Sequence, residues 1–344
     1  MRTGTNANAR PKPLAHGSKQ SDPRAGAGVS ACPACGSGEL EQWRAATGED
    51  GEPQRRTYPL VRCRRCGTAA LPDRERPARP TALYAMSGSN GPAPVAAAIE
   101  GLRKLIDLDR RRVTAALPPR SRVFEVGVGD GRLLALLAAR GHAVAGIEPS
   151  PERAESARAR GIVVATATLE ETELPPGSHD AIVLWHVLEH LDDPRAALAR
   201  MRPWLVPGGR LLVAVPNGSS LQAAIGGDRW FHQDVPRHLV QFTTRGVVLL
   251  LARSGFHVTR VRHVLLEQNL FGMWQTLLNR LTRDRNVAFA LVRRGPSRRR
   301  PIARDAVTVA LAGPPLVPVA VALELASGLV RRGGTVVVEA TLDP

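Results

Sequence analysis

A glycine-rich turn between an apolar strand and a helix is the feature that most constrains the fold of this chain. Residues 123–131 read VFEVGVGDG, and residues 132–140 (RLLALLAAR) have the pattern of a helix. Gly127, Gly129 and Gly131 let backbone approach a ligand where a Cβ would collide, and the helix start offers free N–H groups. We therefore predict a site for a nucleoside-type cofactor.

The glycine spacing distinguishes this turn from a dinucleotide fingerprint. The pattern G-x-G-x-x-G would need a glycine where Arg132 stands, whereas the chain reads E-x-G-x-G-x-G from Glu125 onward. A second strand-like run, HAVAGI at 142–147, ends on Glu148. A carboxylate at the tip of the second strand can accept hydrogen bonds from two vicinal hydroxyls, so the loop and Glu148 together indicate a ribose.

Apolar runs recur along the chain and alternate with helical stretches, which predicts an α/β fold with a parallel sheet covered on both faces. Ligands of such sheets bind at the carboxyl ends of the strands. The predicted strands are 123–126, 143–147, 162–165, 181–185 and 210–215.

Three further motifs give the chain a family resemblance. LPPGSHDAIVLWHVLEHLDDP (174–194) and LVPGGRLLVAVPN (205–217) resemble the fourth and fifth strands of the class I S-adenosylmethionine-dependent methyltransferases. WFHQDVPRHLVQFT (230–243) is similar to a mostly bacterial branch that acts on small molecules. The resemblance covers 95–263 and a last strand near 334–341. It implies a Rossmann-like doubly wound sheet, mostly parallel, with an antiparallel last hairpin.

The resemblance also implies roles for residues at the strand ends. Glu148 would hold the ribose, Leu169 and Glu170 would flank the adenine, and Gly127 and Gly129 would approach the methionine part of S-adenosylmethionine. Glu170 stands where the family more usually has Asp. The predicted cofactor-binding residues are Glu125, Gly127, Gly129, Gly131, Glu148, Leu169, Glu170, Trp185 and His186.

Methyl transfer from a sulfonium is an in-line displacement, so the protein mainly aligns the acceptor and excludes water. A hydroxyl or amine acceptor is helped by a base, and histidine suits that role. We predict His186 and His238 as catalytic residues, with His232 as a further candidate. The alternative is that 230–238 is an ordinary packed loop. The predicted acceptor pocket consists of Trp230, Asp234, Arg237 and His238.

The segment HVLEH (186–190) matches the metalloprotease pattern H-x-x-E-H. That motif needs both histidines on one helix face, whereas this segment directly follows a buried strand. Some quinone-related relatives bind a divalent ion with acidic and histidine residues here, which leaves a metal role open for His186, Glu189 and His190. We favour structural roles for Glu189 and His190 and an active-site position for His186.

Two C-x-x-C-G sequences, CPACG at 32–36 and CRRCG at 63–67, stand about one hairpin apart. This spacing predicts a zinc ribbon with Cys32, Cys35, Cys63 and Cys66 as four closed, structural ligands. The alternative is four unmetallated core cysteines. We expect chelation to unfold this small module and to leave the rest folded.

An insert separates the sixth and seventh predicted strands. Residues 271–304 hold nine Arg and one Asp, and 306–323 are uncharged for eighteen residues. That length reaches the lower edge of a membrane span, but Gly313-Pro314-Pro315 and Pro318 are expected to break it into short helices. We favour a helical hairpin that caps the substrate pocket and has affinity for an anionic membrane surface.

The net charge of +16 raises an alternative, an RNA methyltransferase whose ribbon and arginines grip phosphates. No set of aromatic residues for base stacking accompanies the arginines, so we favour a small-molecule acceptor, hydrophobic or lipid-linked.

The first residues have no apolar core, so we expect a cytoplasmic protein, peripheral at the inner face of the membrane. The predicted organisation is a disordered tail (1–29), a zinc-ribbon-like module (30–72), a linker (73–93), a methyltransferase domain (94–263 and 334–344) and a basic and apolar helical insert (264–333).

Overall fold

The structure is a computed structural model that describes residues 29–48, 56–76, 107–265, 267–292 and 303–343. The predicted tail and most of the predicted linker lie outside these ranges. The strands are β1 (Leu40–Thr47), β2 (Thr57–Cys63), β3 (Ala69–Ala70), β4 (Arg122–Val126), β5 (Ala143–Ile147), β6 (Val163–Ala165), β7 (His179–Trp185), β8 (Leu205–Pro216), β9 (Val240–Gln241), β10 (Phe256–Arg262) and β11 (Thr335–Leu342). The α-helices are α2 (Arg132–Ala138), α3 (Pro151–Arg158), α4 (Pro194–Met201), α5 (Leu221–Gly226), α6 (Thr244–Arg253), α7 (Glu267–Leu281), α8 (Val287–Val292) and α9 (Ala303–Leu329).

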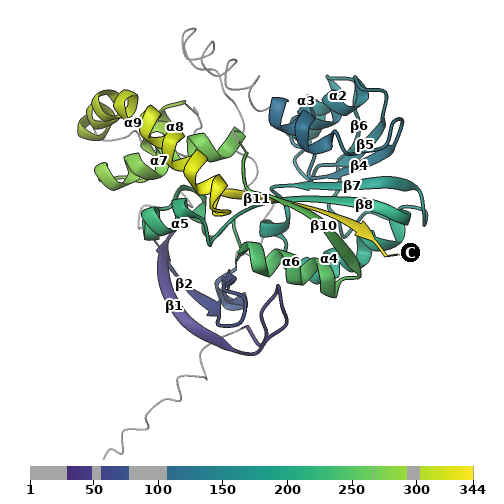
Figure 1. The fold of residues 1–344 in the computed structure, drawn as a ribbon, viewed down its shortest axis with the longest axis horizontal. Helices are drawn as coiled ribbons and strands as arrows, with labels where there is room; N and C mark the ends of the chain where they lie inside the picture. Colours follow the sequence, from purple (N-terminus) through teal and green to yellow (C-terminus); the bar gives the residue numbers. More distant parts are fainter. Residues whose placement is uncertain (1–28, 49–55, 77–106, 266, 293–302, 344) are drawn as a thin grey trace, which may run out of the picture.

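Seven strands form the central sheet in the order β10-β11-β8-β7-β4-β5-β6 (Figure 1). Strands β4 to β8 pair in parallel, and β11 runs antiparallel to both β8 and β10. The predicted doubly wound sheet with an antiparallel last hairpin is therefore confirmed. The strand order reverses between β4 and β7, and open sheets bind their ligands at the carboxyl ends of strands next to such a reversal.

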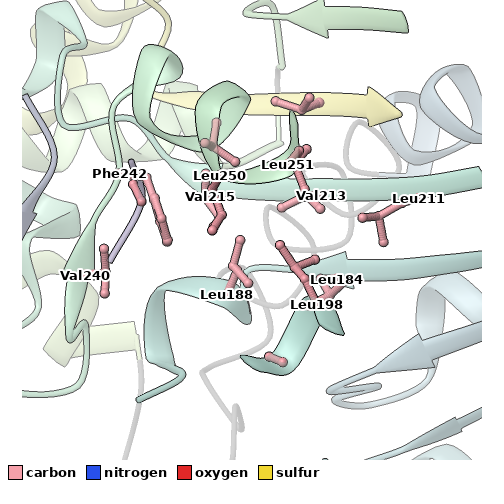
Figure 2. Packing of buried hydrophobic residues seen from close by; sticks show 14 of the residues in the cluster. Leu184, Leu188, Leu198, Leu211, Val213, Val215, Val240, Phe242, Leu250 and Leu251 are labelled. Carbon is pink, nitrogen blue, oxygen red and sulfur yellow. The ribbon is translucent and has the colours of Figure 1, made fainter. Parts of the chain in front are cut away.

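Helices cover both faces of the sheet because successive side chains of a strand point to opposite sides. Val183 of β7 lies in one hydrophobic cluster with Leu134 of α2. Its neighbour Leu184 lies in a second cluster with Leu198 of α4 and Leu250 of α6 (Figure 2). A strand buried on both faces is held firmly, so its carboxyl end is a rigid platform for a site.

The N-terminal cysteine-containing segment forms a second, four-stranded sheet in the order β1-β2-β3-β9. Its last strand, β9, comes from the middle of the chain, with Ala70 of β3 opposite Val240. The cysteines share one hydrophobic cluster with Leu198 and Leu250. The segment is thus joined to the main domain by a sheet and a core, which argues against the expectation that it would unfold alone.

Helices α7, α8 and α9 form the predicted insert between β10 and β11 (Figure 1). The expected break at Gly313-Pro314-Pro315 and Pro318 is wrong, because α9 runs unbroken over 27 residues. Proline removes a backbone donor and crowds the preceding turn, but these three rings lie on the exposed side of the helix. Packing against α7 on the opposite side holds the helix together.

Candidate functional site

A cleft of about 280 Å³ lies at the carboxyl ends of β4, β5 and β7. Five of the predicted cofactor residues line it: Gly127, Glu148, Leu169, Glu170 and His186. A larger, more open groove of about 740 Å³ beside α4 and α6 contains none of the predicted site residues. The smaller cleft is therefore the candidate cofactor site.

Glu148 ends β5 with its side chain almost fully buried. Its Oε2 accepts a hydrogen bond from the Gly129 N–H at 2.8 Å, and its Oε1 accepts one from the Ser150 N–H at 3.0 Å. These bonds fix the carboxylate against the glycine loop. Each oxygen keeps a second lone pair, so the group can also accept from ligand hydroxyls.

The glycine loop adopts a backbone that other residues tolerate poorly. Gly127 has a φ of +75°, and a Cβ there would lie 2.5 Å from the Val187 side chain. Gly129 has a φ of +60°, and no heavy atom of the described residues lies within 4 Å of the place that its Cβ would take. The space where a Cβ of Gly129 would lie is thus empty of protein atoms, and the predicted approach of a ligand to this backbone stays a prediction.

Four other predicted cofactor residues support the cleft and do not line it. Glu125 is buried within β4, and Trp185 is buried at the end of β7 with the Arg110 guanidinium 5.8 Å from its ring centroid. Gly131 precedes α2 with a φ of +81° and forms its N-cap. With Gly129, these residues shape the loop and strand ends, and their predicted contacts with a cofactor stay predictions.

His186 follows β7 with a φ of +56°, a backbone conformation that is uncommon for a residue with a Cβ. Its N–H donates to the Ala214 carbonyl at 2.9 Å, and its Nδ1 lies 3.3 Å from Glu189 Oε1. Burial, followed by the charge of Arg110, lowers the pKa of His186 to about 3. The imidazole is therefore neutral at neutral pH, and the nearby Glu189 carboxylate has no hydrogen-bond partner among the described residues.

His186 and His238, the two predicted catalytic residues, have different partners. The ring of His186 stacks on His232 with centroids 6.4 Å apart, whereas His238 packs edge-on against His190 at 4.8 Å. The Nδ1 atoms of His190 and His238 hydrogen-bond to the carbonyls of Arg237 and His232 at 2.9 and 2.7 Å. Those carbonyls can only accept, so both rings carry their proton on Nδ1.

The segment HVLEH does not build the helix face that a zinc protease motif requires. Leu188–His190 is a single 3-10 turn, and Glu189 points inward with 1% of its surface exposed. One ligand atom from each of Glu189, His190 and His238 lies within 4.8 Å of the others. The Glu189 carbonyl accepts a hydrogen bond from Leu239 N–H, so this turn also positions the segment that carries His238.

The four predicted acceptor residues lie on 230–238 and are absent from the lining of the cleft. Trp230 is fully buried, and Asp234 forms an ion pair with Arg237 at 3.2 Å. The role of these four residues toward an acceptor stays a prediction. The burial of Trp230 agrees with the alternative that 230–238 is an ordinary packed loop.

Sequence reasoning missed two residues of the cleft and one contact between histidine rings. Arg153 and Asp192 line the cleft from the segments that follow β5 and β7. His232, named only as a further candidate, stacks on His186, and its Nε2 has no hydrogen-bond partner among the described residues. No local pattern predicts that stacking, since 46 positions of sequence separate the two rings. Asp192, two residues after His190, could have been considered from the sequence.

The four cysteines converge as predicted. Cys32 and Cys66 have their sulfur atoms 3.6 Å apart, Cys35 and Cys63 have theirs 3.5 Å apart, and all four sulfurs lie within 4.8 Å of one another. A hydrogen bond from Cys32 lowers the pKa of Cys66 to about 4. Tetrahedral zinc with Zn–S bonds of about 2.3 Å separates its sulfurs by roughly 3.8 Å, so this donor set fits zinc.

Comparisons with known proteins find similarity to methyltransferases. Residues 99–261 match the model of a methyltransferase domain family. An uncharacterised protein of Mycobacterium tuberculosis is 33% identical over 156 residues, which are 42% of this chain and 51% of that protein. A ubiquinone biosynthesis O-methyltransferase of Xanthomonas campestris is 33% identical over 119 residues, 33% of this chain and 49% of the relative. The chain thus spans about half the length of the curated relatives it matches.

Solved structures with a similar arrangement are more distant. A SAM-dependent methyltransferase from Thermotoga maritima is 20% identical with a TM-score of 0.44, over 70% of this chain and 91% of that one. Another from Mesorhizobium loti is 18% identical with a TM-score of 0.42, over 67% and 95%. The assignment rests on the matched domain model and on the strand order and cleft described above. Residues 99–261 thus match a methyltransferase domain model, and the described part of them has the strand order of a Rossmann-like methyltransferase fold.

Proposed function

We propose that this chain transfers a methyl group from S-adenosylmethionine to an oxygen of a small, apolar molecule. The observation that carries the proposal is the cleft at the strand reversal, lined by Gly127, Glu148, Leu169, Glu170 and His186. The relatives named as O-methyltransferases favour oxygen as the acceptor atom. Incubation with methyl-labelled cofactor and cell extract tests the acceptor class, and label recovered in RNA in place of small molecules would overturn it.

The residues of the cleft fit the cofactor. Glu148 presents a fixed carboxylate for ribose hydroxyls, Leu169 and Glu170 lie beside it for the adenine, and the open backbone at Gly129 suits the methionine part. The bound cofactor supplies an electrophilic methyl carbon. The chain has to hold the acceptor in line with that carbon and to keep water away.

His186 is the group we assign to the acceptor proton. Its Nδ1 lies 3.3 Å from Glu189 Oε1, so Nε2 is the nitrogen that we assign to take the proton from an acceptor hydroxyl. Glu189 orients the ring and stabilises the imidazolium that forms, as a carboxylate does in a catalytic triad. His232, stacked on His186, forms the next wall of the acceptor side.

Replacing Glu148 by alanine is expected to weaken cofactor binding by roughly 10- to 100-fold, because hydrogen bonds to a charged group contribute about 1.5–3 kcal/mol. Titration calorimetry with S-adenosylmethionine and S-adenosylhomocysteine measures this. The matched control is Glu152→Ala, which removes an exposed carboxylate in the first turn of α3. Failure of the unmodified protein to bind either compound would refute the proposed function.

Replacing His186 by asparagine is expected to lower kcat by about 10²- to 10⁴-fold, the usual contribution of a general base, with cofactor affinity changed far less. Single-turnover kinetics with labelled cofactor separates the two. His238→Asn is the comparison, because the His238 ring packs on His190 and not on the His186 ring. Equal losses in both variants would argue that the histidines act through the fold.

We also propose a structural zinc ion bound by Cys32, Cys35, Cys63 and Cys66. Four buried sulfurs with near-tetrahedral separations support it. One equivalent of zinc in the purified protein, by atomic emission, is the expected result, and a metal-free folded protein would contradict it.

A further inference from the structure

Helix α9 places its polar side chains toward the protein and its apolar side chains toward solvent. The stripe that faces the protein is polar or small, whereas the exposed stripe is apolar. The inward residues are Asp305, Gly313, Ala320, Glu324, Ser327 and Gly328. The exposed apolar stripe consists of Val307, Leu311, Pro314, Pro318, Leu325 and Leu329. Amphipathic helices in water show the opposite arrangement.

The two inward carboxylates, Asp305 and Glu324, hold α9 to neighbouring segments. Asp305 accepts from the backbone N–H groups of Arg283 and Asp284 at 3.1 and 2.7 Å. Glu324 accepts from Gln222 Nε2 at 2.8 Å and from Gly334 N–H at 2.9 Å. The two carboxylates of α9 therefore belong to its attachment, and its outer face has no charge between 306 and 323.

The exposed apolar stripe is long and prominent. Leu311 is 74% exposed and Leu329 is 84% exposed, and only 11% of the most apolar 18-residue stretch of α9 is buried. At 1.5 Å per residue, the stripe from Val307 to Leu329 extends about 33 Å. A continuous exposed apolar patch of this kind marks a surface that is covered in the working protein.

Both ends of α9 are tied to other parts of the protein, through Asp305 to the turn after α7 at one end and through Glu324 to Gln222 and Gly334 at the other. A helix that crossed a bilayer would need its two ends on opposite sides. Although α9 is one helix long and apolar enough to span, its attachments favour an orientation in the plane of the surface.

The charged residues at the two ends of the apolar stripe distinguish between the surfaces that could cover it. Arg304 is exposed at the amino end, and Arg331 and Arg332 are exposed just after the carboxyl end. Pairing of two copies through this face, in either direction, would set arginine against arginine. An anionic lipid surface instead places headgroup phosphates beside the same arginines and acyl chains beside Leu311 and Leu329.

We propose that the outer face of α9 docks in the plane of an anionic membrane surface. The acceptor side of the active site lies on the same lobe, because α7 packs on α9 and a Cβ at Gly272 of α7 would lie 2.7 Å from His232 Nε2. Docking thus brings the His186–His232 pair close to the bilayer, where apolar acceptors dissolve.

Vesicle flotation tests this docking. The protein is mixed at low salt with phosphatidylcholine vesicles that contain phosphatidylglycerol, and with vesicles of phosphatidylcholine alone. We expect binding to the anionic vesicles that weakens with salt. Leu311→Glu combined with Leu329→Glu should reduce the bound fraction by more than about tenfold, because two exposed leucines leave the interface. Val163→Glu, an equally exposed apolar residue on β6 at 72%, should bind like the unmodified protein.

Every other outcome overturns the proposal. No flotation of the unmodified protein, or equal flotation of the double variant, excludes docking through α9, and equal binding to both vesicle types excludes the role of the arginines. A dimer in solution that the double variant dissociates would assign the face to a second copy. Calorimetry with S-adenosylmethionine on the same samples keeps this test separate from that of the enzymatic function, since neither leucine lies near the cleft.

Discussion

Removal of zinc from the cysteine cluster is expected to abolish methyl transfer as well as to unfold the ribbon. Structural zinc contributes about 10–16 kcal/mol of apparent binding free energy in small zinc domains, which is more than most domains have in total stability. Cys63, fully buried on β2, is the position to replace by serine. Zinc content, thermal unfolding and turnover, measured on the same preparation, give the result.

Hydrogen bonds to backbone groups connect the zinc ribbon to the segment that carries Glu189 and His186. Thr243 donates its hydroxyl to the Cys66 carbonyl at 2.6 Å, and Leu71 N–H donates to the Leu239 carbonyl at 2.9 Å. Leu239 N–H in turn donates to the carbonyl of Glu189 at 2.9 Å. Glu189 orients His186, so loss of the ribbon loosens the residues that we assign to the acceptor.

The control for this prediction is Ala45→Ser, which adds a hydroxyl at an exposed position of β1 in the same sheet. It should keep zinc, melting temperature and activity. In Cys63→Ser we expect kcat to fall much more than cofactor affinity, because the cofactor cleft rests mainly on β4, β5 and β7. A zinc-free protein that retains full turnover would show that ribbon and active site are independent.

The sequence allowed the sheet and the cofactor cleft to be predicted because their signals are local. Apolar runs mark β4, β5, β7 and β8, and the glycine loop followed by Glu148 places three groups of the cleft within 22 residues of each other. Each strand end lies at the same edge of a parallel sheet, so the topology brings them together without further information.

Contacts between distant segments carried no such signal. The pairing of β3 with β9 joins two strands of two residues each, which no periodicity can reveal. The stacking of His186 on His232 depends on the left-handed backbone at His186 and on the path of 230–238. The continuity of α9 depends on tertiary packing that outweighs its three prolines, and local propensity predicts the opposite.

Acidification is expected to unfold this protein between about pH 6 and pH 4, because four histidines, two buried (His232 and His238) and two half-buried (His186 and His190), are held in the neutral state. Burial is the main cause that lowers the pKa of His186 and His232 to about 3, that of His190 to about 4, and that of His238 below its usual value. The unfolded chain binds these protons near pH 6.5, whereas the folded chain does not. Stability is therefore complete above pH 6.5 and is lost as the pH falls toward the folded values.

The expected slope is large. One extra proton bound by the unfolded state lowers the free energy of unfolding by about 1.4 kcal/mol per pH unit, so four lower it by up to about 5 kcal/mol per unit. Urea unfolding followed by circular dichroism across this pH range measures the slope. Replacing His190 by glutamine should reduce the number of extra protons bound by the unfolded state by about one, and so lower the slope. A zinc-binding dye in the same samples reports whether the cysteine cluster opens first. A protein that stays folded at pH 4 with zinc bound would show that these rings are hydrated or charged in the native state.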